Sequence, residues 1–155
     1  MKYKELLRST RNVSPTSLQE AGTRRVFDLD LSYDETHKIM TFSGKISGRF
    51  GYYEWIIDFL NVDKTDNLST LEIRENRFPK PSLNRNEIKV FCNCDSFRFT
   101  FSEPNRIRNA KTGPNFPGFV RKSNRASRNP AQQPGVCKHL ITVINHLLHN
   151  GFIFN

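Results

Sequence analysis

Three cysteines and one histidine fall into two short pairs, an arrangement that can bind a metal ion. Cys92 and Cys94 form a C-x-C pair, and Cys137 and His139 form a C-x-H pair further along the chain. Zinc is bound in structural sites by four such sulfur and nitrogen ligands in a tetrahedron, which leaves no position open for water or a substrate. The sequence therefore predicts one closed, structural Zn²⁺ site made by these four residues.

The cysteines also fit two arrangements that need no metal. The thiols could be ordinary core residues, because free cysteine is among the most buried residue types. Cys92 and Cys137 could instead form a disulfide in an oxidising environment. The chain has three cysteines, and this odd number argues against a disulfide framework. A metal site, by contrast, uses all three.

The two pairs are predicted to lie at a hairpin tip and at the start of a helix. Apolar residues alternate along 88–92 and again along 97–102, which predicts two strands joined by a tight turn at 92–95. The helix is expected to begin near 134–136 and to end at 150–151, where Asn-Gly supplies a stop. Its apolar face is formed by Leu140, Ile141, Ile144, Leu147 and Leu148.

The rest of the chain predicts a small antiparallel sheet. Residues 24–86 form this β region, in which apolar and polar residues alternate near the beginning and the apolar run 52–60 is expected to be a central strand. Residues 1–23 are expected to be a polar arm that is ordered by contact with a partner. The predicted fold class is therefore α+β, with the sheet followed by a ββα zinc-binding module at 87–155. This module carries a long basic loop, the C-terminal helix and an apolar tail.

The formal net charge of +9 arises entirely in the second half of the chain. Residues 1–77 contain 12 basic and 12 acidic side chains, whereas residues 78–155 contain 12 basic and 3 acidic ones. This one-sided excess predicts a polyanionic partner, either nucleic acid or an acidic protein surface, unless the charge serves only solubility. The candidate contact residues are Arg98, Arg106, Arg108, Lys111, Arg121, Lys122, Arg125, Arg128, Phe116 and Phe119.

The two pairs and their surroundings resemble a known family. The pattern C-x-C…C-x-H, with the first pair after a strand and the second opening a helix, is similar to the SWIM-type zinc finger over residues 87–150. The segments VFCNCDSFRFTF and NPAQQPGVCKHL resemble a variant of this finger in tailed-bacteriophage virion proteins. The spacer 95–136 is longer than in the common SWIM pattern. The matching positions are Cys92, Cys94, Phe97, Asn129, Pro130, Pro134, Gly135, Cys137, Lys138, His139 and Leu140.

The resemblance implies a non-enzymatic structural component of a tailed-phage virion, in the head, neck or tail, that docks to other virion proteins in multiple copies. Such a protein would be made in the host cytoplasm and located in the virion. The alternative that the resemblance implies is DNA or RNA binding through the basic loop 98–128. No apolar run approaches the ~20 residues needed to cross a bilayer, and no second catalytic group accompanies the metal pairs. We therefore expect neither a membrane partner, nor a small-molecule substrate, nor an enzyme.

Overall fold

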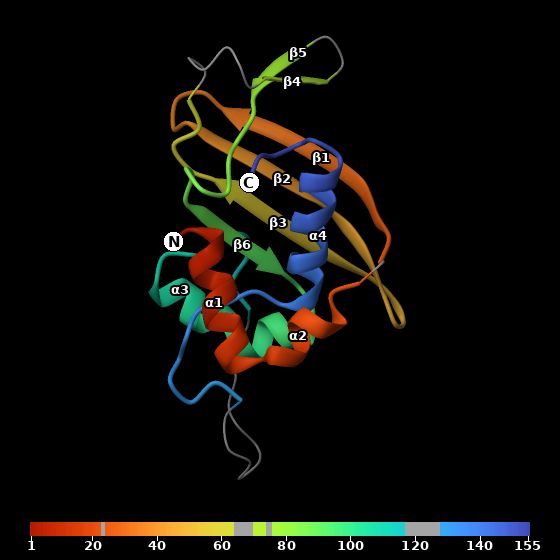
Figure 1. Cartoon of the computed structure of the whole chain (residues 1–155), viewed down its shortest axis with the longest axis vertical. Coiled ribbons are helices and arrows are strands. Elements are labelled where there is room, and N and C mark those ends of the chain that lie inside the picture. The colour runs from red at the N-terminus through yellow and green to blue at the C-terminus, as the bar shows by residue number, and fades with distance from the viewer. Residues whose placement is uncertain (23, 64–69, 74–75, 117–127) are drawn as a thin grey trace.

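A four-stranded antiparallel sheet is the central element of the structure, a computed structural model that describes residues 1–22, 24–63, 70–73, 76–116 and 128–155 (Figure 1). All neighbouring strands are antiparallel, and their spatial order is β1-β2-β3-β6. A separate two-stranded ribbon, β4-β5, lies at one end of this sheet (Figure 1). The strands are β1 (Val26–Asp34), β2 (Ile39–Gly48), β3 (Gly51–Phe59), β4 (Thr70–Ile73), β5 (Asn76–Pro79) and β6 (Ile88–Cys92).

Helices cover one face of the sheet and the region beside β6. Helix α4 lies across the sheet, while α1, α2 and α3 gather near the end of the sheet where α4 begins (Figure 1). None of the helices in the described ranges is long and apolar enough to cross a membrane. The α+β class predicted from the sequence is confirmed. The helices are α1 (Tyr3–Val13), α2 (Pro15–Glu20), the π-helix η1 (Phe97–Phe101), α3 (Ser102–Ile107) and α4 (Lys138–His149).

The core lies between the sheet and α4. Phe42 and Ile57 are direct partners across β2 and β3, so they point to the same face, and both are fully buried. Leu140 and Ile144 of α4 are also fully buried, as the helical spacing predicted. Burying each side chain of this kind contributes about 1.5–3 kcal/mol. The predicted central strand is also confirmed, because β3 lies between β2 and β6.

An irregularity in β1 reverses which face its side chains occupy. The register with β2 shifts between Phe27 and Asp30, and Asp28 within the shift has a φ of 52°. Such a bulge adds one residue to a strand and turns the side chains that follow it. As a result Phe27 pairs with Lys45 on the face away from α4. Leu31, by contrast, pairs with Phe42 on the core face.

The predicted second strand of the ββα module is wrong, because residues 97–107 are helical. Phe97 and Phe101 are fully buried, whereas Phe99 between them is 50% exposed. A separation of four residues returns to the same side of a helix, so this pattern buries two of the three rings on one helical face. The Ser102 N–H donates to the Phe97 carbonyl, five residues back, as a π-helix requires.

Two helices, α1 and α2, occupy most of the segment 1–23 that was expected to be a polar arm, and α1 packs on the chain's own core; contact of this segment with a partner stays a prediction. Tyr3, Leu6 and Thr10 lie on one side of α1 and are buried. The break between α1 and α2 falls at Ser14, because a residue that precedes proline disfavours helical geometry, and Pro15 then begins α2. The sequence did not predict this packing, because only one narrow stripe of α1 is apolar. In the apolar C-terminal tail, Ile153 is buried, with 2% exposure, whereas Phe152 and Phe154 are half-buried.

Candidate metal centre

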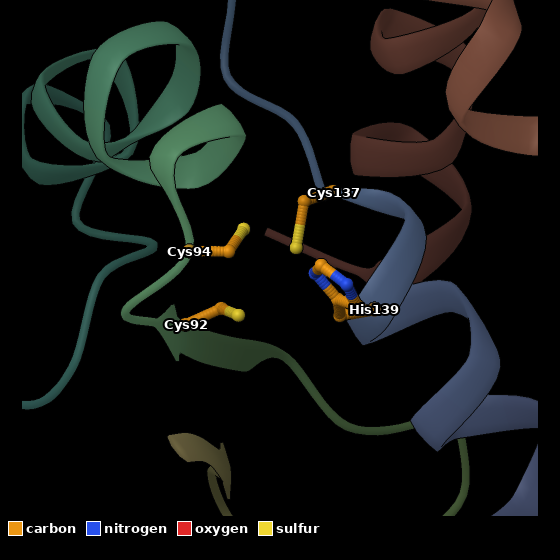
Figure 2. Close-up of side chains that lie close together, drawn as sticks. All are labelled: Cys92, Cys94, Cys137 and His139. Carbon is orange, nitrogen blue, oxygen red and sulfur yellow. The ribbon is translucent and has the colours of Figure 1, made fainter. Parts of the chain in front are cut away.

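Four side chains from two distant segments meet in one buried cluster (Figure 2). The Sγ atoms of Cys92, Cys94 and Cys137 and a ring nitrogen of His139 all lie within 4.8 Å of one another. Tetrahedral zinc would place these atoms roughly 3.5–3.8 Å apart, from Zn–S and Zn–N distances of about 2.3 and 2.0 Å. The longest separation in the cluster is therefore at most about 1.0–1.3 Å greater than in a metal-bound site. The three cysteines are free thiols, so the Cys92–Cys137 disulfide is not formed.

The first pair is held by the end of β6 and the turn that follows it. The Asn93 N–H donates to the Glu54 carbonyl at 3.1 Å, and the Glu54 N–H donates to the Asn93 side-chain oxygen at 2.9 Å. These bonds extend the pairing of β3 with β6 past Cys92 and fix the turn. The Phe97 N–H then donates to the Cys94 sulfur at 3.4 Å. The turn thus aims both thiols at the same point, and η1 begins directly after it.

The second pair lies at the beginning of α4. Cys137 is the N-cap residue, with extended geometry, and its carbonyl accepts the Ile141 N–H at 3.1 Å. The Cys137 thiol receives a backbone hydrogen bond from Leu140. Backbone N–H groups at a helix N-terminus carry partial positive charge and favour a nearby thiolate. His139 is in the first turn, where its ring points toward the three thiols (Figure 2).

Residues just before Cys137 are fixed by two other parts of the chain. Thr10 of α1 accepts the Val136 N–H at 2.8 Å. Asn105 of α3 makes a reciprocal pair with Gly135, donating to its carbonyl at 2.9 Å and accepting its N–H at 2.8 Å. A Cβ at Gly135 would lie 2.4 Å from the Phe101 ring, so only glycine fits. These contacts set the path by which the chain enters α4.

The loop upstream of this entry is organised by Asn129, a buried side chain. Its amide group donates to the carbonyls of Thr100 and Gln133 at 2.9 and 2.7 Å, and its oxygen accepts the Gln133 N–H at 2.9 Å. Lys138, at the start of α4, donates to Glu20 of α2 at 2.9 Å. Asn129, Gly135 and Lys138, three of the motif positions, therefore shape and support the segment that carries Cys137.

Tyr53 of β3 covers the open side of the histidine. The centroids of the Tyr53 and His139 rings are 4.8 Å apart. Gly48 of β2 makes room for the tyrosine, because a Cβ there would lie 2.4 Å from the Tyr53 ring. Gly48 is the last residue of β2, and it permits this close approach. The β2–β3 hairpin thus forms one wall of the cluster.

Burial and mutual hydrogen bonding shift the pKa values of the three thiols in opposite directions. Burial raises the pKa of Cys92 and Cys137 well above the ordinary value, because a thiolate loses its hydration in the interior. Hydrogen bonds from the Cys137 and Cys92 thiols stabilise the Cys94 thiolate and lower the pKa of Cys94. Without a metal, the negative charge of the cluster therefore falls on Cys94, while Cys92 and Cys137 stay protonated. A bound divalent cation would deprotonate all three.

The strongest evidence for a bound ion is the state of His139. Its side chain is buried, and neither Nδ1 nor Nε2 makes a hydrogen bond of ordinary distance and angle within the described residues, although the ring lies close enough to the Cys94 thiolate to help lower the pKa of Cys94. Leaving a buried polar group unsatisfied costs about 1–3 kcal/mol. Three sulfurs and one imidazole are the ligand set of a structural transition-metal site. The cluster thus fits one metal ion.

The predicted contact residues of the basic loop are only partly placed by the structure. Arg121, Lys122, Arg125 and Phe119 lie outside the described residues. Phe116 stacks on Phe91 with centroids 5.5 Å apart, and Arg98 and Lys111 lie over the Phe116 ring at 5.5 and 6.0 Å. Arg106 forms an ion pair with Glu103 at 2.6 Å, while Arg108 and Arg128 are exposed. Of the predicted contact residues that the structure describes, Arg98, Lys111 and Phe116 therefore form one small cluster. Arg106, Arg108 and Arg128 are exposed cations outside it.

Comparisons with models of protein families, with curated proteins and with solved structures find no match to this chain. The similarity to the SWIM-type finger therefore depends on the motif itself. What the structure establishes for that motif is a buried Cys₃His cluster compatible with a metal ion.

Several residues that support the cluster are not identifiable from the sequence. Tyr53 belongs to an apolar strand pattern, and Thr10 belongs to the segment predicted to be a polar arm. Asn105 falls in the segment predicted to be a loop. The one available signal is the glycine of the P-G-x-C segment, because a glycine beside a metal ligand often marks a close approach of backbone to a neighbouring side chain.

Proposed function

We propose that this chain is a zinc protein in which the ion has a purely structural role. The observation that carries this proposal is the buried His139 with two unsatisfied nitrogens beside three thiols. Thiolate and imidazole ligands favour zinc, and a tetrahedral set supplied entirely by the protein leaves no coordination position for a substrate. We therefore also propose that the protein is not an enzyme.

The ion would connect the end of β6 to the start of α4. Cys92 and Cys137 are separated by 45 positions in the sequence. A structural zinc contributes about 10–16 kcal/mol of apparent binding free energy in small zinc fingers, and this energy is available only in the folded state. In this chain it would hold the helix entrance, η1 and the hairpin wall together. The domain would then present its remaining surfaces to other macromolecules as a rigid body.

Elemental analysis of the purified chain tests the metal assignment. We expect one zinc per chain, with loss of zinc in Cys94→Ser, Cys137→Ser and His139→Gln. Because the cluster holds residues 95–136 between its two halves, the serine variants should also be cut faster by protease in this segment. His149→Gln, an exposed histidine on the same helix, is the matched control and should retain the ion. A folded wild-type chain without any bound transition metal would contradict the proposal.

We further propose that this zinc domain is a component of a tailed-phage virion, made in the host cytoplasm and docked to other virion proteins. The resemblance of the segments around Cys92 and Cys137 to those of phage virion proteins supports this assignment. The basic excess in residues 78–155 would suit an acidic partner surface. Mass spectrometry of purified particles is the test: the chain should be present at a fixed copy number. Its absence from intact particles would contradict this role.

Nucleic-acid binding through the basic loop is the alternative function. It is favoured by the cluster in which Arg98 and Lys111 lie over the Phe116 ring, since cations with aromatic rings suit both phosphates and bases. The two functions differ in salt dependence. A nucleic-acid binder loses affinity steeply as salt rises, whereas a virion component should remain in the particle through the same salt wash.

A further inference from the structure

The β2–β3 hairpin carries the most exposed aromatic side chain of the described residues. Phe50 lies in the turn between the strands and is 91% exposed, and Tyr52 at the beginning of β3 is 54% exposed. An aromatic ring that remains in water loses the free energy of burial. The Arg49 guanidinium lies over the Phe50 ring at 5.2 Å, and the position of Phe50 in the turn keeps the ring out of the core. The ring is therefore available to a partner.

A second aromatic ring and two cations surround Tyr52 on the same face of the sheet. Tyr52 pairs with Ser47, and Lys45 pairs with Phe27, which places all four side chains on the face opposite α4. The Phe27 and Tyr52 rings meet edge to face with centroids 6.1 Å apart. Lys45 lies over the Tyr52 ring at 4.7 Å, and Arg25 lies over the Phe27 ring at 5.1 Å. The bulge at Asp28 is what brings Phe27 to this face.

The charge of this region is positive. Residues 24–28 and 45–54 together contain four basic and two acidic side chains. Lys45 is paired with Asp28 at 3.2 Å. Arg25 and Arg49 are exposed, and neither forms a salt bridge with a carboxylate within the described ranges. In this part of the structure, two exposed guanidinium groups thus flank three aromatic rings.

We propose that this hairpin surface, made of Arg25, Phe27, Lys45, Arg49, Phe50 and Tyr52, binds single-stranded nucleic acid. Bases would stack on Phe50 and Tyr52, and the backbone phosphates would contact Arg25 and Arg49. Single-strand binders combine these two elements, because every base has a flat face and every linkage carries a charge. An apolar protein partner would not require the cations, and a duplex would hide the base faces.

This surface is distinct from the basic loop. There, the Phe116 ring is half-buried and stacked on Phe91, whereas the Phe50 ring of the hairpin is 91% exposed. The hairpin surface depends on the proposed zinc only through Tyr53, which lies near the turn and whose ring contacts His139 on the α4 face of the sheet. The metal would keep this end of the hairpin rigid from one face, while stacking and phosphate contacts occur on the opposite face and at the turn.

Fluorescence anisotropy of the zinc-loaded full chain with labelled oligo-dT and oligo-rU of about 15 nucleotides tests the proposal. Phe50→Ala and Tyr52→Ala should each weaken binding by roughly 5- to 150-fold, the loss that corresponds to one stacked base. Arg25→Ala with Arg49→Ala should reduce the slope of log affinity against log salt by about 1–2, as expected for two lost phosphate contacts on a single strand. Ile107→Ala, an equally exposed apolar side chain on α3 (59%), is the matched control and should bind as wild type.

Three outcomes would overturn the proposal. The first is no binding of either oligonucleotide at about 50 mM salt, with capture on anionic vesicles or by a protein instead. The second is binding that Phe50→Ala and Tyr52→Ala leave unchanged. The third is binding that is lost only when Arg106 and Arg108 are replaced. Zinc content measured on the same samples separates these results from a failure of the metal assignment, because the hairpin variants should all retain the ion.

Discussion

Replacement of Thr10 by valine tests whether α1 stabilises the entrance to the metal centre. The threonine hydroxyl is fully buried, donates to the Leu6 carbonyl at 2.8 Å and accepts the Val136 N–H at 2.8 Å. Valine has nearly the same shape but no oxygen, so it would leave the Val136 N–H buried without a partner. An unsatisfied buried donor costs about 1–3 kcal/mol, which for a chain of this size lowers the Tm by about 2–12 °C.

The same change should weaken the metal. Val136 directly precedes Cys137, so part of the lost free energy falls on the metal-bound state. If all of it did, the affinity would fall by roughly 5- to 150-fold, which is an upper bound. Thermal unfolding with and without a chelator measures the first effect, and competition with a chromophoric chelator measures the second.

Thr10→Ser is the matched control, since it retains the hydroxyl and removes only a methyl group. We expect its metal affinity to equal that of wild type and its free energy of unfolding to fall by less than that of the valine variant. The reasoning is refuted if valine leaves both quantities unchanged, because the hydrogen bond would then contribute nothing. It is also refuted if serine and valine are equally damaging, because the loss would then arise from packing alone.

Three further predictions concern the walls and ligands of the centre. Gly135→Ala would place a methyl group 2.4 Å from the Phe101 ring and 2.7 Å from the Thr10 hydroxyl. We therefore expect its free energy of unfolding, measured by chemical denaturation, to fall by about 1–3 kcal/mol or more. Gly22→Ala, whose Cβ would have no neighbour closer than 3.7 Å, should leave stability unchanged, and equal stabilities of the two variants would contradict the packing argument. Tyr53→Ala should lower the free energy of unfolding by about 1–3 kcal/mol and speed extraction of the metal by chelators. Tyr53→Phe keeps the ring over His139 and should behave as wild type. If neither variant changes the rate of extraction, the ring does not shield the site. Acidification should release the ion, because protons compete for the thiolates and the imidazole. The stabilisation by metal is present at neutral pH and is lost as the pH falls, so unfolding curves with and without chelator should converge in acid. A difference between the two curves that persists in acid would argue against thiolate ligation.

The ligand cluster could be predicted from the sequence because its chemistry is local to two short segments. Each of the C-x-C and C-x-H pairs needs only a turn or a helix start to aim its two ligands at one point, and the helix that follows His139 has an unambiguous apolar spacing. The antiparallel sheet was predictable for a similar reason, because a short run rich in aromatic and β-branched residues, such as β3, favours a strand.

The segment after Cys94 shows where this reasoning fails. Phe97, Phe99 and Phe101 alternate as a strand would, but Phe97 and Phe101 are also four residues apart, which places them on one face of a helix. A run of five residues cannot distinguish the two periods. The Phe97 N–H donates to the Cys94 sulfur and the Arg98 N–H donates to the Cys94 carbonyl. These bonds begin a helical turn, and hydrophobic periodicity does not reveal them.

Helix α1 and the hairpin surface were missed for different reasons. Most side chains of α1 are polar. Its buried stripe includes Thr10, which accepts a hydrogen bond from Val136, a residue 126 positions away. The exposed face of the hairpin depends on the bulge at Asp28, where a positive φ moves Phe27 across the sheet. Hydrophobic periodicity predicts neither a hydrogen bond between distant residues nor a β-bulge.

The contact between α1 and the residues before Cys137 also constrains the order in which the molecule can be completed. During synthesis the Thr10 hydroxyl must wait for Val136 to emerge, so α1 has no such partner while most of the chain is being made. Contacts between such distant positions form slowly, because the intervening chain must be brought together first. In a nascent chain the Thr10 end of α1 would therefore lack this contact until the segment with Cys137 and His139 arrives. Capture of the ion and docking of α1 would then occur as one late, coupled step.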